Sequence, residues 1–490
     1  YMLIEDLILH YMPMIFENYT VKSKSLIRIT RNADIDIDEI FADEDISYRE
    51  SMEEMIRMRT KLCPIRMEYS RVLDEKVIRS LCKELNLKKE QTFHQETPLD
   101  FDFVFKIQDM LRNRKELFFK RRIPQVSTAI DKTQPMIDQI EKKDILLSYP
   151  FESMTSFINL LKEAAADPNV ASIKMTLYRV AKNSQVVEAL IDAAENGKEV
   201  VVMVELRARF DEQNNIEWSR RMEDAGCRII YGIDHTKVHS KICLISYKKD
   251  NQVKHITQVG TGNYNEKTAK QYTDVSLVTA DQNIGADAAA FFSNMALGNL
   301  EGSYGTLLVA PHQLKKPILA RIEEQTALGP NGYILMKFNS LTDIDVIHAL
   351  SRASQAGVRV ELIIRGICCL APGVPGYTDN ITVTSIVGRF LEHSRIFCFG
   401  RGEQEQVYIS SADMMTRNTV RRVEIACPIR SPEIRRRLHE ILDAMLADTV
   451  KARVLLPDGT YTKKPPSYEP VCAQVLLMKR AVEAAQQQST

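Results

Sequence analysis

Two similar arrangements of apolar and polar positions follow one another in the C-terminal part of the chain. In the first, an apolar strand at 173–176 leads into a helical pattern that ends at Gly197, and the strand 200–206 follows. In the second, the strand 334–338 leads into a helical pattern that ends at Gly357, and another apolar strand follows. Because the order of elements and the glycine at the helix end are repeated, the pattern predicts an internal duplication of one α/β unit.

A strand predicted at 238–244 carries a histidine and a lysine on one face. Side chains two residues apart on a strand point the same way, so we expect His239 and Lys241 to project together. A loop rich in glycine and asparagine, 260–267, follows the next strand and includes Asn263. The backbone N–H groups and amides of such a loop approach oxyanions closely. An imidazole, an ammonium group and this loop predict a phosphate site with its own nucleophile.

The second copy carries a related histidine. His393 is followed by Arg395, by a short strand and by a polar loop at 410–418. Asp413 in that loop is expected to orient the His393 imidazole or to help protonate it. A third match, at 235–237, lies on a predicted loop, and its histidine is interpreted as solvent-exposed. His-x-Lys alone is a weak signal, but its recurrence at the matching place of two half-copies is not expected by chance.

Four arginines are predicted at strand ends or just beyond them, where α/β folds place their ligands. They are Arg179, Arg209, Arg365 and Arg422. Each one alone is compatible with a surface or ion-pair role, but their matched places in the two half-copies favour a shared function. Because the planar guanidinium group binds phosphate through two parallel hydrogen bonds, these residues predict a phosphate site.

The pairing of the two halves resembles the phospholipase D superfamily, in which two such halves face each other over one active site. Longer stretches resemble a narrower family, the bacterial polyphosphate kinases; they are 176–181, 205–212, the His239 strand, 260–274 and 391–395. This resemblance covers almost the whole chain. It implies an α/β fold, with an α+β head region followed by two phospholipase D-like α/β domains that form a pseudo-twofold pair.

The resemblance and the linker composition together predict three domains. Residues 1–124 are expected to be the remainder of a head or dimerisation domain, 125–305 the first catalytic domain and 306–490 the second. Proline and polar residues near 124 and a glycine-containing stretch near 305 mark the boundaries. The helical pattern that is already present at Tyr1, without a preceding cap, indicates a fragment that lacks the family's N-terminal domain and the start of its head domain.

The resemblance implies reversible transfer of the γ-phosphate of ATP to the end of an inorganic polyphosphate chain, with Mg²⁺ as cofactor. It implies that His239 becomes the phosphohistidine, that Lys241 holds a phosphate oxygen, and that His393 acts as general acid or phosphate ligand. The expected ATP- and phosphate-binding residues are Tyr272, Arg365, His393, Arg179, Arg209, Asn263 and Arg422. The family associates Mg²⁺ with the positions of Arg179 and Arg209. Because a guanidinium group is not a metal ligand, we interpret these arginines as binding the phosphates that hold Mg²⁺.

Two features depart from the phospholipase D pattern and disfavour phosphodiester hydrolysis. Asp250 comes too late after Lys241 for the usual spacing, and Arg395 stands where a lysine is usual. Two alternatives remain: a phosphodiesterase or phosphatidyl transferase of the phospholipase D kind, and a non-catalytic polyanion-binding protein. Release of ADP with growth of an acid-labile polymer identifies the kinase. Binding that does not depend on His239 identifies the binding protein.

Composition limits the binding partners and the cellular location that we expect for this chain. The 490 residues are 44% hydrophobic and 27% charged with a formal net charge of zero, so the whole-molecule charge does not indicate nucleic acid or membrane binding. Nine cysteines without a Cys-x-x-Cys motif indicate a reducing cytoplasm, and no apolar run has the length of a membrane span. We expect ATP or ADP and polyphosphate as partners, no nucleic acid, no integral membrane segment, and a homo-oligomer (dimer or tetramer). The expected location is cytoplasmic, with peripheral attachment at the inner face of the membrane as an alternative.

Overall fold

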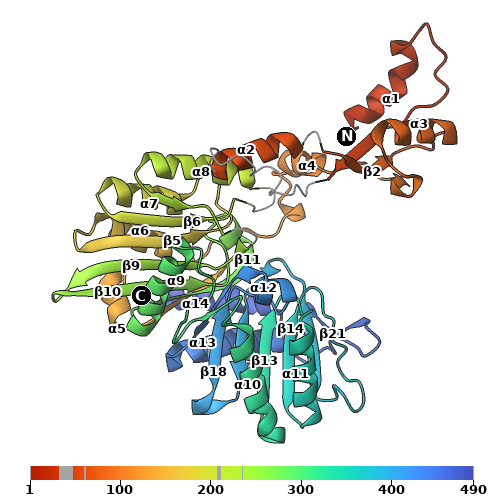
Figure 1. The fold of residues 1–490 in the computed structure, drawn as a ribbon. Coiled ribbons are helices and arrows are strands. Elements are labelled where there is room, and N and C mark those ends of the chain that lie inside the picture. Colours follow the sequence, from red (N-terminus) through yellow and green to blue (C-terminus); the bar gives the residue numbers. More distant parts are fainter. Residues whose placement is uncertain (1, 33–47, 60–61, 207–210, 234–235, 489–490) are drawn as a thin grey trace. The chain divides into compact units, whose positions relative to one another are not determined.

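The chain divides into two compact units, residues 1–122 and 123–490 (Figure 1). The computed structural model describes residues 2–32, 48–59, 62–206, 211–233 and 236–488. Arg209 and the histidine of the 235–237 stretch lie outside the described residues. Among the described helices, none combines the length and the apolar character of a membrane span. All nine cysteines are described, and all are free thiols.

Unit 1, residues 1–122, combines four described helices with a three-stranded sheet. The helices are α1 (Ile4–Ile15), α2 (Tyr48–Arg59), α3 (Glu75–Leu85) and α4 (Phe103–Met110), and the strands are β1 (Ile27–Arg31), β2 (Pro64–Tyr69) and β3 (Thr92–His94). Strand β2 pairs antiparallel with β1 and parallel with β3. Ile78 and Cys82 of α3 pack with Met67 of β2, so this unit has a hydrophobic cluster of its own.

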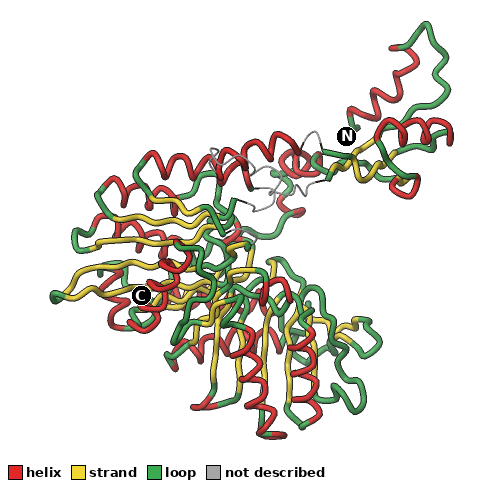
Figure 2. The backbone as a smooth tube through the Cα atoms, viewed as in Figure 1, coloured by secondary structure: helices red, strands yellow, loops and turns green. Residues whose placement is uncertain are grey.

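The first half of unit 2 is an α/β arrangement in which helices flank a mixed sheet (Figure 2). Its strands are β4 (Ile145–Tyr149), β5 (Val170–Leu177), β6 (Glu199–Val204), β7 (Arg228–Ile230), β8 (Lys237–Val238), β9 (Ile242–Lys249), β10 (Gln252–Gly260) and β11 (Tyr272–Thr279). Its helices are α5 (Met136–Lys142), α6 (Thr155–Ala166), α7 (Gln185–Glu195), α8 (Glu212–Asp224) and α9 (Gln282–Ala296). The sheet runs in the order β11-β10-β9-β5-β6-β7, and β4 pairs with β11.

The second half of unit 2 repeats this architecture around a larger sheet. Its strands are β12 (Leu308–Val309), β13 (Tyr333–Phe338), β14 (Arg359–Ile364), β15 (Ile381–Ile386), β16 (Leu391–Glu392), β17 (Ile396–Phe399), β18 (Gln406–Ser410), β19 (Arg422–Val423), β20 (Ile425–Pro428), β21 (Ala452–Leu455) and β22 (Tyr461–Lys463). Its helices are α10 (Lys315–Ala327), α11 (Ile344–Gln355), α12 (Thr416–Val420), α13 (Pro432–Leu446) and α14 (Ala473–Gln487). The sheet runs in the order β12-β20-β18-β17-β13-β14-β15-β21-β22.

Equivalent residues start and stop the equivalent helices of the two halves. The Ser184 hydroxyl accepts a hydrogen bond from a backbone N–H in the first turn of α7, and the Asp343 carboxylate does the same for α11. Gly197 and Gly357 follow these helices with φ values of 80° and 93°, which only glycine adopts readily. In each half the strand before the helix pairs parallel with the strand after it, β5 with β6 and β13 with β14. The predicted duplication and the α/β fold class are therefore confirmed.

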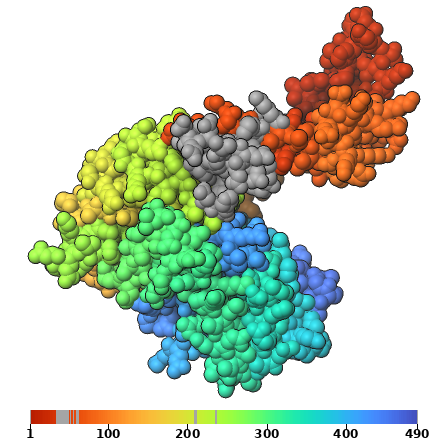
Figure 3. All heavy atoms as spheres, in the orientation of Figure 1, coloured from red at the N-terminus to blue at the C-terminus, as the bar shows by residue number. Residues whose placement is uncertain are grey.

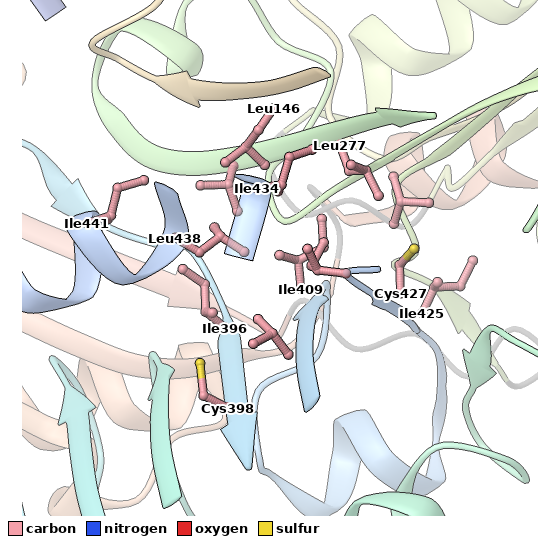
Figure 4. Close-up of a cluster of buried hydrophobic side chains, with 14 of the residues drawn as sticks. Leu146, Leu277, Ile396, Cys398, Ile409, Ile425, Cys427, Ile434, Leu438 and Ile441 are labelled. Carbon is pink, nitrogen blue, oxygen red and sulfur yellow. The ribbon is translucent and has the colours of Figure 1, made fainter. Parts of the chain in front are cut away.

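Strand pairing and a common core join the two halves. Strand β16 of the second half pairs parallel with β11 of the first, and β19 pairs parallel with β8. In the space-filling view, the green and blue segments of this unit touch along a continuous boundary (Figure 3). Apolar side chains from both halves meet in one core, among them Leu277 from the first half and Ile409, Ile434 and Leu438 from the second (Figure 4). The halves form one body, so residues from both can contribute to one site.

Candidate active site

His239 and Lys241 lie in a break between two strands rather than on one strand. The prediction of a continuous strand over 238–244 is wrong, because β8 ends before His239 and β9 begins after Lys241. The backbone N–H of His239 instead donates to the carbonyl of Val423 at 2.9 Å, which extends the pairing of β8 with β19 of the second half. The same break separates β16 from β17 around His393. Each histidine therefore sits where a strand of one half leaves its sheet to meet the other half.

The ring of His239 is bonded to a carboxylate from the other half. Its Nδ1 atom lies 2.9 Å from both carboxylate oxygens of Glu424, which is fully buried, whereas the His239 side chain is 11% exposed. The Ser411 hydroxyl and the Asn418 amide each donate to this carboxylate at 2.5 Å. The Tyr178 ring meets the imidazole edge to face, with centroids 4.9 Å apart. A carboxylate at Nδ1 holds the proton there and leaves the lone pair of Nε2 for nucleophilic attack.

His393 is held in the same way by a carboxylate from the first half. Its Nδ1 atom lies 2.9 Å from both carboxylate oxygens of Asp274, and the Thr261 hydroxyl donates to Asp274 at 2.6 Å. Gly262 leaves the room that this carboxylate needs, because a Cβ atom at that position would overlap the Asp274 side chain. The glycine-rich loop predicted to cradle phosphate therefore also positions the carboxylate behind the second histidine.

Arg395 joins the second histidine to the loops of both halves. Its Nε and Nη2 atoms donate to the Asp413 carboxylate at 3.1 and 3.2 Å, and Nη1 donates to the Thr261 carbonyl at 3.0 Å. Nη1 also lies 3.3 Å from Nε2 of His393. The expectation that Asp413 orients His393 is wrong, because Asp413 is occupied with the guanidinium group. Arg395 in turn places a buried positive charge beside the imidazole.

Burial and the positive neighbours favour neutral imidazoles. Burial lowers the pKa of His239 and of His393 below the ordinary histidine value, and Glu424 and Asp274 oppose this only in part. Burial would raise the pKa values of the two carboxyl groups, but the facing histidines hold both pKa values below their ordinary range. Burial also lowers the pKa of Lys241 to about 7. Without substrate, the site at neutral pH therefore has neutral imidazoles on ionised carboxylates and an ammonium group that deprotonates easily.

Lys241 is the second cation of this centre. Its side chain is 1% exposed, its Nζ donates to the backbone carbonyl of His239, and it lies 5.4 Å from the centroid of the Tyr178 ring. A buried ammonium group with a carbonyl and an aromatic face as neighbours gains when an anion enters the site. The predicted pairing of His239 with Lys241 is therefore present, although a strand does not create it.

Tyr272 and Arg365 lie on the His393 side of the site. The Tyr272 ring is tilted by 51° against the His393 ring, with centroids 5.2 Å apart. Nε of Arg365 donates to Oδ1 of Asn339 at 2.8 Å and to the Glu392 carbonyl at 2.5 Å, and the Asn339 amide donates to the His393 carbonyl at 3.3 Å. The structure thus brings three residues expected to bind nucleotide into one group.

Arg179 and Arg422 lie on the His239 side. Arg179 follows β5, pairs with Asp211 at 3.1 Å, and has its guanidinium carbon 5.9 Å from the centroid of the Tyr178 ring. Arg422 is the first residue of the two-residue strand β19, so it lies at the amino end of a strand rather than at a carboxyl end. Its position beside β8 nevertheless brings its charge close enough to contribute to the lowered pKa of His239, after burial and the nearer groups.

Asn263 offers a hydrogen-bond acceptor to a ligand, and the residues of this site offer few free metal ligands. Oδ1 of Asn263 is buried and has no hydrogen-bond partner among the described residues, so it remains an available acceptor. The described residues contain one group of three side chains that could hold a metal ion, and that group does not include any residue named in this site. The two carboxylates beside the histidines are already engaged. The side chains present therefore fit phosphate binding better than direct metal ligation.

Two residues at the centre of the site, Asp274 and Glu424, received no role from sequence reasoning. A signal was available, because Thr261 precedes Asp274 by 13 positions and Ser411 precedes Glu424 by 13 positions. In both places the hydroxyl donates to the carboxylate. It also accepts from the backbone N–H of the residue that follows the carboxylate residue, at 3.1 Å from Val275 and 3.0 Å from Ile425. Aligning the two half-copies over their loops, rather than over their histidines alone, would have shown this match.

Comparison with known proteins gives a consistent assignment. The sequence matches the polyphosphate kinase middle domain at residues 1–107, polyphosphate kinase C-terminal domain 1 at 135–299 and polyphosphate kinase C-terminal domain 2 at 307–474. The polyphosphate kinase of Staphylococcus haemolyticus is 40% identical over 490 residues, which cover 99% of this chain and 67% of that protein. The polyphosphate kinase of Bacillus cereus is 41% identical over 489 residues, which cover 99% of this chain and 69% of that protein. The chain thus spans about two thirds of the length of these relatives.

A solved structure agrees with the sequence relatives. The crystal structure of polyphosphate kinase from Porphyromonas gingivalis matches with a TM-score of 0.82 and 34% sequence identity, over 99% of this chain and 71% of that one. The match includes both units of the chain, since it covers nearly all residues. The chain therefore belongs to the polyphosphate kinase family.

Proposed function

We propose that this chain transfers the γ-phosphate of ATP reversibly to the end of an inorganic polyphosphate chain, through a phosphohistidine at His239. The observation that carries the proposal is the reciprocal pairing at 2.9 Å of His239 with Glu424 and of His393 with Asp274 across the two halves. Membership of the polyphosphate kinase family supports the class of reaction, a phosphotransferase, and the names of the relatives support polyphosphate as substrate.

His239 is the proposed nucleophile. Its Nε2 atom attacks the γ-phosphorus of ATP, the N–P bond forms while the bond to the β,γ-bridging oxygen breaks, and ADP leaves. Glu424 keeps the Nδ1 proton and stabilises the positive charge that the ring acquires. In the second step a terminal oxygen of polyphosphate attacks the phosphorus, which lengthens the polymer by one phosphate and restores the neutral imidazole. The same steps in reverse transfer phosphate from the polymer to ADP.

His393 is proposed to serve the phosphate from the opposite side. Its ring is neutral without substrate, because burial lowers its pKa and Arg395 adds to this effect, although Asp274 opposes it. A phosphate group beside Nε2 brings negative charge and favours the protonated ring. With Asp274 on one nitrogen and phosphate on the other, protonated His393 binds the phosphate and acts as general acid toward the leaving oxygen.

The cations of the site are proposed to neutralise the phosphates, which is most of what phosphoryl transfer requires. Lys241 and Arg365 bind phosphate oxygens beside the two histidines, and Tyr272 stacks on the adenine ring. The remaining proposed phosphate ligands are Arg179, Arg209, Arg422 and Asn263. Magnesium would be held by the phosphates near Arg179 and Arg209 and would supply further charge neutralisation. The absence of a carboxylate-rich metal cluster among the described residues of this site supports ligation through phosphate.

The setting of the reaction is proposed from the sequence and the family. We place the protein in the cytoplasm, with peripheral attachment at the inner membrane face as the alternative, and nine free thiols support a reducing compartment. A homo-oligomer, dimer or tetramer, and partners restricted to ATP, ADP and polyphosphate remain part of the proposal. The proposed domains are a head domain over 1–124 and catalytic domains over 125–305 and 306–490, and the end of the first compact unit at residue 122 supports the first boundary.

Incubation with Mg²⁺ and ATP labelled at the γ-phosphate tests the proposal. We expect ADP release together with growth of an acid-labile labelled polymer, lost in His239→Ala and retained in His348→Ala, which changes an exposed histidine on α11. Cleavage of a phosphodiester substrate without polymer would instead identify a phospholipase D-type hydrolase or transferase. Polyphosphate binding without ADP release, unaffected by His239→Ala, would identify a polyanion-binding protein. A polyphosphate kinase of known activity serves as the positive control.

A further inference from the structure

The one group of potential metal ligands among the described residues lies in the second half and shares no residue with the paired-histidine site. Cys398 on β17, Glu405 directly before β18 and His439 on α13 have their ligand atoms within 4.8 Å of one another. Cys398 is fully buried, the Glu405 side chain is 7% exposed and the His439 side chain is 29% exposed. We propose that these three residues form a structural zinc site.

The donor atoms determine which metal ion fits. A thiolate, an imidazole nitrogen and a carboxylate oxygen are the three ligand types that zinc takes in proteins, at about 2.0 to 2.3 Å from the ion. Magnesium and calcium select oxygen ligands only, so this group is distinct in chemistry from a magnesium–nucleotide site. Nε2 of His439 now lies 2.7 and 2.9 Å from the two Glu405 oxygens. Tetrahedral ligands around zinc lie about 3.5 Å apart, so small side-chain movements admit the ion.

The surroundings supply an entry path and room for a water molecule as fourth ligand. Asp443 lies one helical turn after His439 on α13, and side chains at this spacing share a helix face. Asp443, His439 and Glu405 all line one solvent-open pocket of about 520 Å³. A water molecule from the pocket would complete the tetrahedron, while Cys398 binds from the core side, where it packs in the common core (Figure 4). The pocket gives the ion a route that a fully enclosed cysteine would lack.

Without a bound metal ion, the Cys398 side chain is a protonated thiol. Burial raises the pKa of Cys398 well above its ordinary value, and the negative charge of Glu405 adds to this effect. Zinc binding therefore releases the thiol proton to solvent, and a thiolate–metal bond replaces the S–H bond. The internal duplication does not account for the thiol, because Leu244 follows His239 at the same spacing at which Cys398 follows His393. The group is a feature of the second half alone.

A bound zinc ion would tie α13 to the β17–β18 hairpin. Among the described contacts, these elements are held here by the His439–Glu405 bond and by hydrogen bonds from Arg435 to the Glu403 and Glu405 carbonyls at 3.4 and 2.9 Å. Metal that binds the folded state and not the unfolded chain raises stability in proportion to the logarithm of its concentration over Kd. The proposed role is therefore structural and independent of phosphoryl transfer.

Cobalt and zinc titrations of the purified chain, stripped of metal with a chelator, test the site. We expect one Co²⁺ per chain, with a thiolate-to-cobalt absorption band in the near ultraviolet, and displacement of Co²⁺ by Zn²⁺. The band should vanish in Cys398→Ser, binding should weaken at least tenfold in His439→Ala, and both should persist in Cys427→Ser and His348→Ala. Cys427 is an equally buried thiol outside the group, and His348 is an exposed histidine.

A second readout covers variants that fold poorly. Glu405→Gln keeps the shape of the side chain and a hydrogen bond to His439, so it should fold and still lose at least tenfold in Zn²⁺ affinity. Saturating Zn²⁺ should raise the unfolding temperature of the unmutated chain and of Cys427→Ser by more than that of Glu405→Gln at the same concentration. Absence of the thiolate band in the unmutated chain, or Zn²⁺ binding by Glu405→Gln and Cys398→Ser as tight as that of the unmutated chain, would overturn the proposal.

Discussion

The imidazole of His239 is bonded through Nδ1 at 2.9 Å to the carboxylate of Glu424, although the two residues are 185 positions apart and belong to different halves of the duplication. His393 and Asp274 repeat this bond in the opposite direction, with the histidine from the second half and the carboxylate from the first. Neither half alone contains both members of either of these two pairs. The exchange of carboxylates is therefore the structural basis for one shared site rather than two separate ones.

Replacing Glu424 by glutamine should slow phosphorylation of His239 by about 10²-fold or more. The amide can donate to Nδ1, which moves the ring proton to Nε2 and removes the nucleophilic lone pair. The measurement is the initial rate of protein labelling by γ-labelled ATP. Glu361→Gln, a change on β14 at a glutamate that accepts from Tyr333 at 2.6 Å, is the matched control and should label normally. Labelling of Glu424→Gln at the unmutated rate would refute the assigned tautomer.

Gly262→Ala should reduce turnover by roughly 10²-fold, since a small displacement of a reacting group is enough for such a loss. The added Cβ atom overlaps the Asp274 carboxylate, which must move and release the His393 ring. Gly305→Ala is the control, because a Cβ atom there meets no other atom within 4 Å and the residue does not have a positive φ. Steady-state ADP release, compared with the thermal unfolding of both variants, separates lost positioning from lost folding. An active Gly262→Ala enzyme would mean that Asp274 does not control His393.

Regular periodicity explains which parts of the fold were predictable. The helices that became α7 and α11, their terminal glycines, and the parallel strands on either side were visible as apolar spacing and helix stops. The partnership of His239 with Lys241 was also visible, because it depends on residues two positions apart. Local patterns of this kind predict the folded structure because caps and an apolar face within the element itself stabilise each helix or strand.

The parts that sequence reasoning missed depend on long-range pairing. The break at His239 arises because β8 pairs with β19 of the other half, and no local pattern reports such a pairing. The assignment of Asp413 to His393 failed because Arg395, two positions away on the same segment, binds that carboxylate first. Glu424 lies inside an apolar stretch, and no local pattern marks it as a site residue. Its role follows from the contact with His239, which is distant in sequence.

Arg365→Lys should raise KM for ATP with a smaller effect on the chemical step. The guanidinium group uses Nε to bond Asn339 and the Glu392 carbonyl, and its planar set of donors is one that an ammonium group does not reproduce. Steady-state kinetics over a range of ATP concentrations measure the change. Arg352→Lys, on α11 and paired with Glu323, keeps the same chemistry at the surface and should behave as the unmutated enzyme. Equal kcat/KM in the two variants would remove Arg365 from the nucleotide site.

Polyphosphate binding should take up a proton at Lys241 when the pH is above 7. Burial lowers the pKa of Lys241 to about 7 without substrate, and a bound polyanion raises it. The charged side chain therefore contributes fully to binding below pH 7, and this contribution declines as the pH rises through the pKa of the bound state. Calorimetric titration of polyphosphate at pH 8, in buffers of different ionisation enthalpy, counts the protons.

Lys241→Arg provides the comparison for this proton count. Arginine stays charged over the whole range, and the equivalent residue of the second half, Arg395, shows that a buried site in this fold accepts it. The unmutated chain should take up close to one proton more than Lys241→Arg at pH 8. The same proton count in both proteins would show that Lys241 is already charged before substrate arrives.

The position of the phosphoryl group on the protein tests the shared-site account most directly. The chain is labelled briefly with γ-labelled ATP, digested under alkaline conditions that preserve phosphohistidine, and mapped by mass spectrometry. We expect an acid-labile phosphoryl group on His239 alone, its complete loss in His239→Ala, and about 10²-fold slower labelling of the same residue in His393→Ala. Label on His393, or labelling of His239→Ala at the normal rate, would contradict this expectation.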